Sequence, residues 1–193
     1  TIFSNGGMSV VKGDYLYFVN GYVDAASLTK DDNKAGQVTK AGIYRTKLNN
    51  QEIDKDVDGF LTEGTTDRVV SKVVGFDKGG FYIYGDNIYY ATPYMKLNKE
   101  GVLQNDRIEF HRIGIDGTND SVVYTTAAAD EALDWSVVKV GDVVYFIIYE
   151  SSDLIVIDAG NGKEIGRAED VSSYGFYEEE THRVEDNRTG LNY

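Results

Sequence analysis

The chain repeats one stretch, Gly13-Asp14-Tyr15-Leu16-Tyr17-Phe18, three times in related form. The second copy is Gly85-Asp86-Asn87-Ile88-Tyr89-Tyr90, and the third is Gly141-Asp142-Val143-Val144-Tyr145-Phe146. In each copy the Gly-Asp pair is typical of a tight hairpin turn, and the apolar and aromatic residues after it are typical of a strand. The pattern therefore predicts three β-hairpins, whose first strands are expected over 8–11, 81–84 and 135–140.

Each hairpin is followed by further residues with strand character. Strands in sequential antiparallel order form a meander, and a four-stranded meander is the blade of a β-propeller. The sequence thus predicts an all-β fold, a single propeller-like domain or fragment over 1–193. Third strands are expected over 42–46, 108–113 and 154–158, and fourth strands over 121–125 and 164–168, which divides the chain into blades of approximately 5–74, 79–126, 133–169 and a partial 172–193.

The spacing of the repeats bears on whether the blades close into a ring. The Gly-Asp turns begin at residues 13, 85 and 141, farther apart than the period of about 40–50 residues that is usual for blades. The excess is expected in loops over 21–41, 49–67 and 95–106. Three and a fraction blades do not close a ring of about four to eight. The chain is therefore expected to be part of a larger ring, completed by the rest of a longer chain or by self-association; a compact stack of three sheets is the alternative.

Two of the repeats carry further motif residues. Asn5-Gly6-Gly7 precedes the first Gly-Asp turn, and His111-Arg112-Ile113-Gly114-Ile115-Asp116-Gly117-Thr118 ends the second unit. With these residues the chain resembles a family of bacterial surface β-propellers of unknown function, and the third unit is closer to quinoprotein-like repeats through Ile157-Asp158-Ala159-Gly160-Asn161-Gly162-Lys163-Glu164. The resemblance implies a propeller fold and an extracellular or cell-surface location in a bacterium. It does not imply a quinone cofactor.

Composition narrows the range of partners and chemistry. The 32 acidic residues outnumber the 19 basic ones, and the resulting net charge of −13 repels phosphate backbones, so no nucleic acid is expected as a partner. The chain has no Cys, which excludes disulfides, thiolate metal sites and a Cys nucleophile. No stretch of the sequence has the apolar length that a membrane span requires, so no membrane insertion is expected.

One acidic segment matches the first half of a calcium-binding loop. Carboxylates at alternate positions converge on a hard cation, the Gly after them allows a sharp turn, and the next backbone carbonyl adds an oxygen ligand. Position 12 of such a loop is normally Glu but is Thr65 here, so Glu63 or Asp67 would have to replace it. The alternative is an exposed acidic turn without metal. The predicted calcium ligands are Asp54, Asp56, Asp58, Phe60 through its carbonyl, and Glu63.

Other polar and aromatic residues have simpler structural interpretations. The strand pattern places His111 on a strand surface, and the spacing of the two histidines, His111 and His182, defines no catalytic triad. Acidic residues that recur in the Gly-Asp turns are expected to serve the turns. A group of tyrosines could either stack on sugars or pack between blades, and we expect packing. These turn acids are Asp14, Asp86 and Asp142, and the tyrosines are Tyr82, Tyr84, Tyr89, Tyr90 and Tyr94.

The functional prediction that follows is a non-catalytic cell-surface or secreted propeller module that binds a protein or glycan partner. Two alternatives remain open at this point. The first is a polysaccharide hydrolase or lyase, since 32 acidic residues allow many carboxylate pairs. The second is a purely structural module of a larger chain. Turnover of glycans distinguishes the first alternative, and an absence of any binding distinguishes the second.

Overall fold

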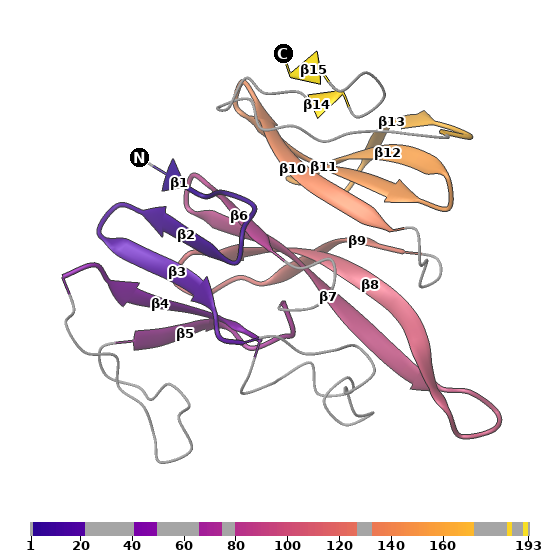
Figure 1. Cartoon of the computed structure of the whole chain (residues 1–193), viewed down its shortest axis with the longest axis horizontal. Helices are drawn as coiled ribbons and strands as arrows, with labels where there is room; N and C mark the ends of the chain where they lie inside the picture. Colours follow the sequence, from indigo (N-terminus) through magenta and orange to yellow (C-terminus); the bar gives the residue numbers. More distant parts are fainter. Residues whose placement is uncertain are drawn as a thin grey trace.

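A computed structural model describes residues 2–21, 41–49, 66–74, 80–126, 133–171, 185–186 and 191–192. Within these residues the fold is all-β and contains no helix, and so no helix long and apolar enough to cross a membrane. Three antiparallel meander sheets follow one another along the chain (Figure 1), so the prediction of all-β meander blades is confirmed. They do not close into a barrel.

The sheets are numbered in chain order. Sheet 1 contains β1 (Ile2–Phe3), β2 (Ser9–Lys12), β3 (Tyr15–Val19), β4 (Ile43–Lys47) and β5 (Thr66–Val70). Sheet 2 contains β6 (Phe81–Tyr84), β7 (Asn87–Leu97), β8 (Leu103–Gly114) and β9 (Ser121–Thr125). Sheet 3 contains β10 (Asp134–Val140), β11 (Val143–Glu150), β12 (Asp153–Asp158) and β13 (Glu164–Ala168). Of the predicted fourth unit, the structure describes only β14 (Glu185–Asp186) and β15 (Leu191–Asn192), which pair with each other.

The three predicted hairpins form as two-residue Gly-Asp turns. Gly13, Gly85 and Gly141 have φ of 59°, 58° and 61°, whereas none of the following Asp residues has a positive φ. A first turn residue in this region followed by one with negative φ fits a type II′ turn, which matches the twist of the flanking strands. The turns fix the register of each hairpin, for example Val10 opposite Tyr17.

Two features of the sheets differ from the sequence prediction. Sheet 1 has a fifth strand, because β1 pairs with the edge of β2 through Ile2 and Phe3. Residues 95–106, expected as a loop, instead extend β7 and β8 into a long hairpin that projects beyond sheet 2 (Figure 1). We call residues 94–107 the arm. A bulge between Tyr94 and Met95 marks its base.

The only proline of the chain lies just before the arm, in the part of β7 that extends past its pairing with β6. Pro93 is opposite Ile108, whose N–H and C=O both bond to Thr126 on the β9 side. Because these groups of Ile108 point away from β7, the pair is not hydrogen-bonded and the nitrogen of Pro93 faces the other edge. Pro lacks a donor there, and no described strand pairs with that edge beyond Tyr90.

Sheet 2 is covered on both faces by the other two sheets. We call the face of each sheet that points to the next sheet in chain order its front face, and the opposite face its rear face. Val10, Tyr17 and Ile43 of the sheet 1 front face pack on the sheet 2 rear face. The front face of sheet 2 packs on the rear face of sheet 3. There the ring of Phe110 lies edge-on to those of Trp135 and Phe146, with ring centroids 5.6 and 5.5 Å apart.

Polar ties between the sheets recur at equivalent positions. Arg45 in β4 donates to the carbonyl of Ile115 in sheet 2 at 3.1 Å. Its counterpart Arg112 in β8 donates to the carbonyls of Ala159 and Gly160 in sheet 3, at 3.3 and 3.2 Å. Close backbone contacts recur too, because a Cβ on Gly117 or Gly162 would lie only 2.8 Å from a carbonyl oxygen of the preceding sheet. Both turns therefore need Gly, because a side chain at this position would prevent the close contact with the preceding sheet.

The Asn5-Gly6-Gly7 segment closes the free edge of β6. Asn5 accepts from the Ile83 N–H at 2.7 Å through its side-chain oxygen, and its amide nitrogen donates to the Ile83 carbonyl at 3.3 Å. Gly6 donates its backbone N–H to the Phe81 carbonyl at 2.8 Å, and Gly7 accepts from Phe81 at 3.2 Å. These three residues act as a strand-like cap, which protects an edge that would otherwise be open to pairing.

Candidate functional site

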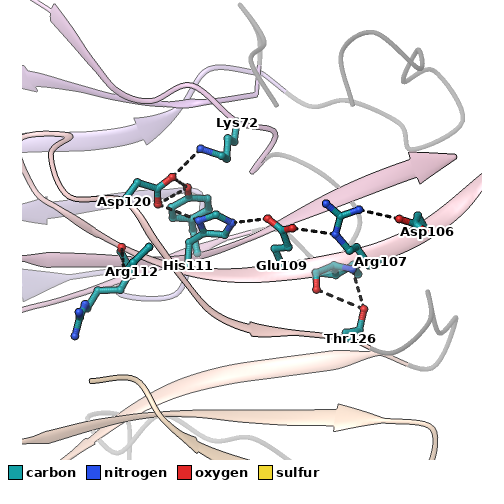
Figure 2. A network of polar contacts seen from close by, with 11 residues as sticks. Lys72, Asp106, Arg107, Glu109, His111, Arg112, Asp120 and Thr126 are labelled. Atoms are coloured by element: carbon teal, nitrogen blue, oxygen red, sulfur yellow. Dashed lines mark hydrogen bonds and ion pairs between the residues drawn. The ribbon is translucent and has the colours of Figure 1, made fainter. Parts of the chain in front are cut away.

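A chain of charged side chains runs between sheet 1 and sheet 2 toward the arm (Figure 2). It begins at Lys72, which follows β5, and continues through Asp120, His111 and Glu109 to Arg107 at the base of the arm. β8 supplies three of these residues at alternate positions, so their side chains share the rear face of sheet 2. We call this group the charged network, and it also includes Asp106.

His111 lies at the centre of the charged network. Its Nδ1 lies 2.9 Å from Asp120 and its Nε2 lies 3.1 Å from Glu109, and the ring stacks on Tyr90 with centroids 4.9 Å apart. Both partners are carboxylates, which accept hydrogen bonds only, so both are satisfied when each ring nitrogen carries a proton. With 3% of its surface exposed, His111 is not the strand-surface residue that the sequence predicted. That prediction failed because the rear face of sheet 2 is covered by sheet 1.

Asp120 joins the two sheets at one end of the charged network. It accepts from Lys72 at 2.7 Å and from the Tyr90 hydroxyl at 3.0 Å. Burial disfavours its charged form, but the hydrogen bonds from His111 and Lys72 outweigh burial and lower the pKa of Asp120 to about 2. Burial raises the pKa of the Tyr90 hydroxyl, and the neighbouring Asp120 carboxylate raises it further. Asp120 is therefore ionised and Tyr90 neutral over the physiological range.

Arg107 connects the charged network to the arm. It donates to Glu109 at 2.9 Å and to Asp106 at 2.8 Å, and its guanidinium lies 4.2 Å from the ring centroid of Tyr94. Although burial opposes it, hydrogen bonding to Arg107 and His111 lowers the pKa of Glu109. Burial and the neighbouring Glu109 carboxylate raise the pKa of Tyr94 to about 12. The base of the arm is thus held by paired, ionised groups.

The chemistry of the charged network suits a structural role, in which ion pairs hold elements together. A glycosidase pair needs one carboxyl group whose raised pKa keeps it protonated as the general acid. The pKa values of Asp120 and Glu109 are instead both lowered, and each carboxylate is engaged by cationic partners. His111 has both nitrogens occupied by these two residues. The group therefore fixes sheet 1, sheet 2 and the arm relative to one another.

The predicted calcium ligands lie outside the residues that the structure describes. Asp54, Asp56, Asp58, Phe60 and Glu63 all fall between β4 and β5. Asp67, the alternative ligand, is in β5 and accepts from Arg45 at 3.2 Å. In the described part of the chain, no three or more Asp, Glu or His side chains form a group suited to a metal ion. The calcium site stays a prediction.

The tyrosines largely follow the packing interpretation. Tyr89 and Tyr90 are buried. Tyr82 and Tyr84 reach sheet 3, where their hydroxyls contact the Ser136 hydroxyl at 3.3 Å and the Val137 carbonyl at 3.2 Å. Tyr94 is the exception, because it lies under Arg107 at the base of the arm. The sequence does contain one signal of the charged network, the alternation of Arg107, Glu109 and His111. That signal indicates a buried polar face only if sheet 2 is known to lie between two other sheets.

Comparison with known proteins adds no identity. No family model matches the chain, and no curated protein matches it.

Proposed function

We propose that this chain is a non-catalytic cell-surface or secreted propeller-like module that binds a protein or glycan partner, with the arm as its recognition element. The observation that carries the proposal is the arm itself, a two-stranded extension that leaves the body of sheet 2 (Figure 1) and is fastened at its base by the charged network (Figure 2). Recognition elements that project from a rigid scaffold are a common arrangement for binding.

The tip of the arm combines order with exposed apolar surface. The side-chain oxygen of Asn98 accepts from the N–H groups of Glu100 and Val102 at 3.0 and 2.8 Å, and Gly101 donates to the Asn98 carbonyl at 3.0 Å. These bonds define a compact turn. Beside it, Leu97 and Val102 are 48% and 59% exposed. Two apolar side chains held outward on an ordered turn are suited to contact with a partner.

The charged network supports binding by holding the arm in place. A hairpin of two strands is marginally stable alone. Lys96 pairs with Asp106 at 3.0 Å across the arm, and Asp106 leads through Arg107 and Glu109 to His111 in the body. Because the arm does not need to be ordered when the partner binds, the entropic cost of association falls.

The alternative of a hydrolase or lyase receives no support from the charged network. Its two central carboxylates have lowered pKa values, which suits ion pairs and opposes a general-acid role. A purely structural role is distinguished from binding by experiment. The proposed binding function is that of the whole chain with its arm, and it includes the cell-surface or secreted location.

The test compares substitutions at the arm tip with a matched substitution elsewhere. The double variant Leu97→Asp/Val102→Asp places charge on the tip, and Val122→Asp on β9 is the control because Val122 is 51% exposed and lies outside the arm. Binding is measured against an immobilised panel of purified cell-surface proteins and glycans. We expect the double variant to bind at least about tenfold more weakly, a loss of roughly 1.4 kcal/mol, and the control to bind like the wild type.

Three results would count against the proposal. Release of reducing ends or unsaturated products from a glycan would show catalysis. Binding that survives the double variant unchanged would remove the arm as the recognition element. Failure of the wild-type chain to bind any member of the panel would favour the purely structural role.

A further inference from the structure

The cap of Asn5, Gly6 and Gly7 contains a pair of residues, Asn-Gly, that is reactive in an open chain. The backbone nitrogen of the Gly can attack Cγ of the Asn side chain, because Gly has no side chain to hinder the approach. The Gly nitrogen loses its proton and bonds to Cγ, the bond between Cγ and Nδ2 breaks, and the side-chain nitrogen leaves as ammonia. Water then opens the resulting succinimide ring to aspartate or iso-aspartate. The reaction needs no other reactant, so access to an open conformation controls its rate.

The closed cap engages both reacting groups of Asn5 and Gly6 in other bonds. The Gly6 N–H donates to the Phe81 carbonyl at 2.8 Å, and this bond keeps the proton on the nitrogen that would have to attack. The Asn5 side chain is fixed at both ends, because Oδ1 accepts from the Ile83 N–H at 2.7 Å and Nδ2 donates to the Ile83 carbonyl at 3.3 Å. Tyr82 covers Gly6, since a Cβ on Gly6 would lie only 2.7 Å from the Tyr82 ring. Attack by Gly6 therefore requires the cap to leave β6.

A second pair of the same kind, Asn161-Gly162 in the turn before β13, provides an internal comparison. The Gly162 N–H donates to the Asp158 carbonyl at 2.8 Å. The Asn161 Oδ1 accepts from the Lys163 N–H at 2.9 Å. These partners all belong to one turn, which is exposed at Asn161, whereas the side chain of Asn5 bonds to a residue 78 positions away. A turn opens by a local fluctuation, but the cap opens only when the start of the chain separates from sheet 2.

We propose that Asn5 is a deamidation site gated by the cap: the closed cap prevents the reaction, and each opening exposes Asn5 to it. The product cannot restore the cap. In both products a carboxylate oxygen replaces the Nδ2 donor and would face the Ile83 carbonyl. In iso-aspartate the main chain also gains one carbon before Gly6, which breaks the spacing of the bonds to Phe81 and Ile83. Modification therefore makes a reversible opening permanent and leaves the edge of β6 free to pair.

The first experiment follows deamidation of the full chain in mildly alkaline buffer, with and without a denaturing concentration of guanidinium. Mass spectrometry of peptides gives the rates at Asn5 and Asn161. In denaturant the two rates should agree within about threefold, because both pairs are then open. In buffer Asn5 should react at least about tenfold more slowly than Asn161. Equal rates at the two sites in buffer would overturn the proposal. The third pair, Asn20-Gly21, borders residues outside the described ranges and takes no part in the comparison.

A variant opens the cap without touching Asn5 or Gly6. Gly80 has a φ of 110°, and a Cβ there would overlap the Gly6 carbonyl oxygen, so Gly80→Ala should push the cap off β6. We expect it to raise the rate at Asn5 at least about tenfold and to leave Asn161 unchanged. Gly101→Ala is the matched control, because Gly101 has a φ of 77° at the arm tip and its Cβ would meet nothing within 4 Å. An unchanged rate at Asn5 in a folded Gly80→Ala chain would overturn the proposal.

Hydrogen exchange of the wild type tests the gate even if Gly80→Ala does not fold. The opening that frees the Gly6 N–H from Phe81 for exchange also frees the nitrogen for attack. The protection factor of the Gly6 amide should therefore match the factor by which folding slows deamidation at Asn5, within about threefold. A rapidly exchanging Gly6 amide beside a slow Asn5 would overturn the gate. In the deamidated chain the Ile83 amide should lose its protection, and an Ile83 amide that stays protected would overturn the permanent opening.

Discussion

Sheets 2 and 3 reverse the relation between strand pattern and burial. In β8 of sheet 2 polar residues alternate with apolar ones, which is the pattern of a strand with one face in water. From Ile108 to Ile113, however, both faces are covered by neighbouring sheets, and the polar face carries Glu109 and His111 of the charged network. In sheet 3, β11 from Val143 to Tyr149 is a nearly continuous apolar run, the pattern of a strand buried on both sides, yet one face stays half-exposed. Position in the stack, rather than strand pattern, decides which face meets water.

The strongest test of this contrast removes an aromatic ring from between the sheets. Phe110 is fully buried and contacts Tyr124, Trp135 and Phe146. We expect Phe110→Ala to lower the free energy of unfolding by about 3–5 kcal/mol, through lost burial and the cavity left behind. Ile165→Ala in β13, where Ile165 is 56% exposed, should change it by less than about 0.5 kcal/mol. Urea unfolding measures both, and similar losses would contradict the assigned core.

A second test asks whether the buried polar face of sheet 2 depends on its ions. His111→Phe keeps the stacking on Tyr90 but removes the donors between Asp120 and Glu109, leaving two carboxylates close together. We expect a loss of about 3 kcal/mol, as for a broken buried ion pair. Arg167→Met in sheet 3 breaks ion pairs with Asp153 and Glu164 at the surface and should change stability within experimental error. If the two variants had equal effects, the charged network would have no special role.

The third test uses the pH dependence of stability. Since folding lowers the pKa of Asp120 to about 2, the stabilisation is fully present above the unfolded pKa of about 3.9 and is lost as pH falls through the folded pKa. The wild type should therefore lose about 2 kcal/mol between roughly pH 4 and pH 2 from this group. Asp120→Asn should lack this component. When the free energy of unfolding is measured with denaturant at each pH and plotted against pH, the variant should give a shallower slope than the wild type. An unchanged slope would show that Asp120 is not the responsible group.

The smallest expected effect concerns sheet 1, whose last two strands, β4 and β5, are joined by residues 48–65, in contrast to the shorter turns between the last two strands of sheets 2 and 3. If Asp54, Asp56 and Asp58 bind calcium with a Kd of about 0.1–1 mM, tenfold excess should stabilise the chain by about 1.4 kcal/mol. Thermal melts with calcium and with chelator measure this. Equal melting temperatures in the wild type would remove the site, and a shift that survives Asp56→Ala would place the metal elsewhere.

Local structure was accessible from the sequence, whereas contacts between sheets were not. The Gly-Asp turns, β6, β9 and β13 form at the predicted residues, because turn chemistry and strand pattern are local properties. The prediction for His111 is wrong because its burial depends on other elements: Asp120 after β8 contacts the ring, and Lys72 after β5 pairs with Asp120. The sequence predicts a loop in place of the arm because Asn98 and Gly101 indicate a turn but do not give the lengths of the strands beside it.

The cap of Asn5, Gly6 and Gly7 on β6 has a consequence for the order in which the chain folds during synthesis. Within each sheet every strand pairs with its neighbour in sequence, but the bond between Asn5 and Ile83 joins residues 78 apart. At a translation rate of about 5–20 residues per second, Asn5 is synthesised roughly 4–16 s before Ile83. Until sheet 2 follows, the apolar face of sheet 1 with Val10, Tyr17 and Ile43 has no sheet to pack on. The sheet 1 segment of the nascent chain therefore exposes an apolar face to chaperones until sheet 2 has left the ribosome.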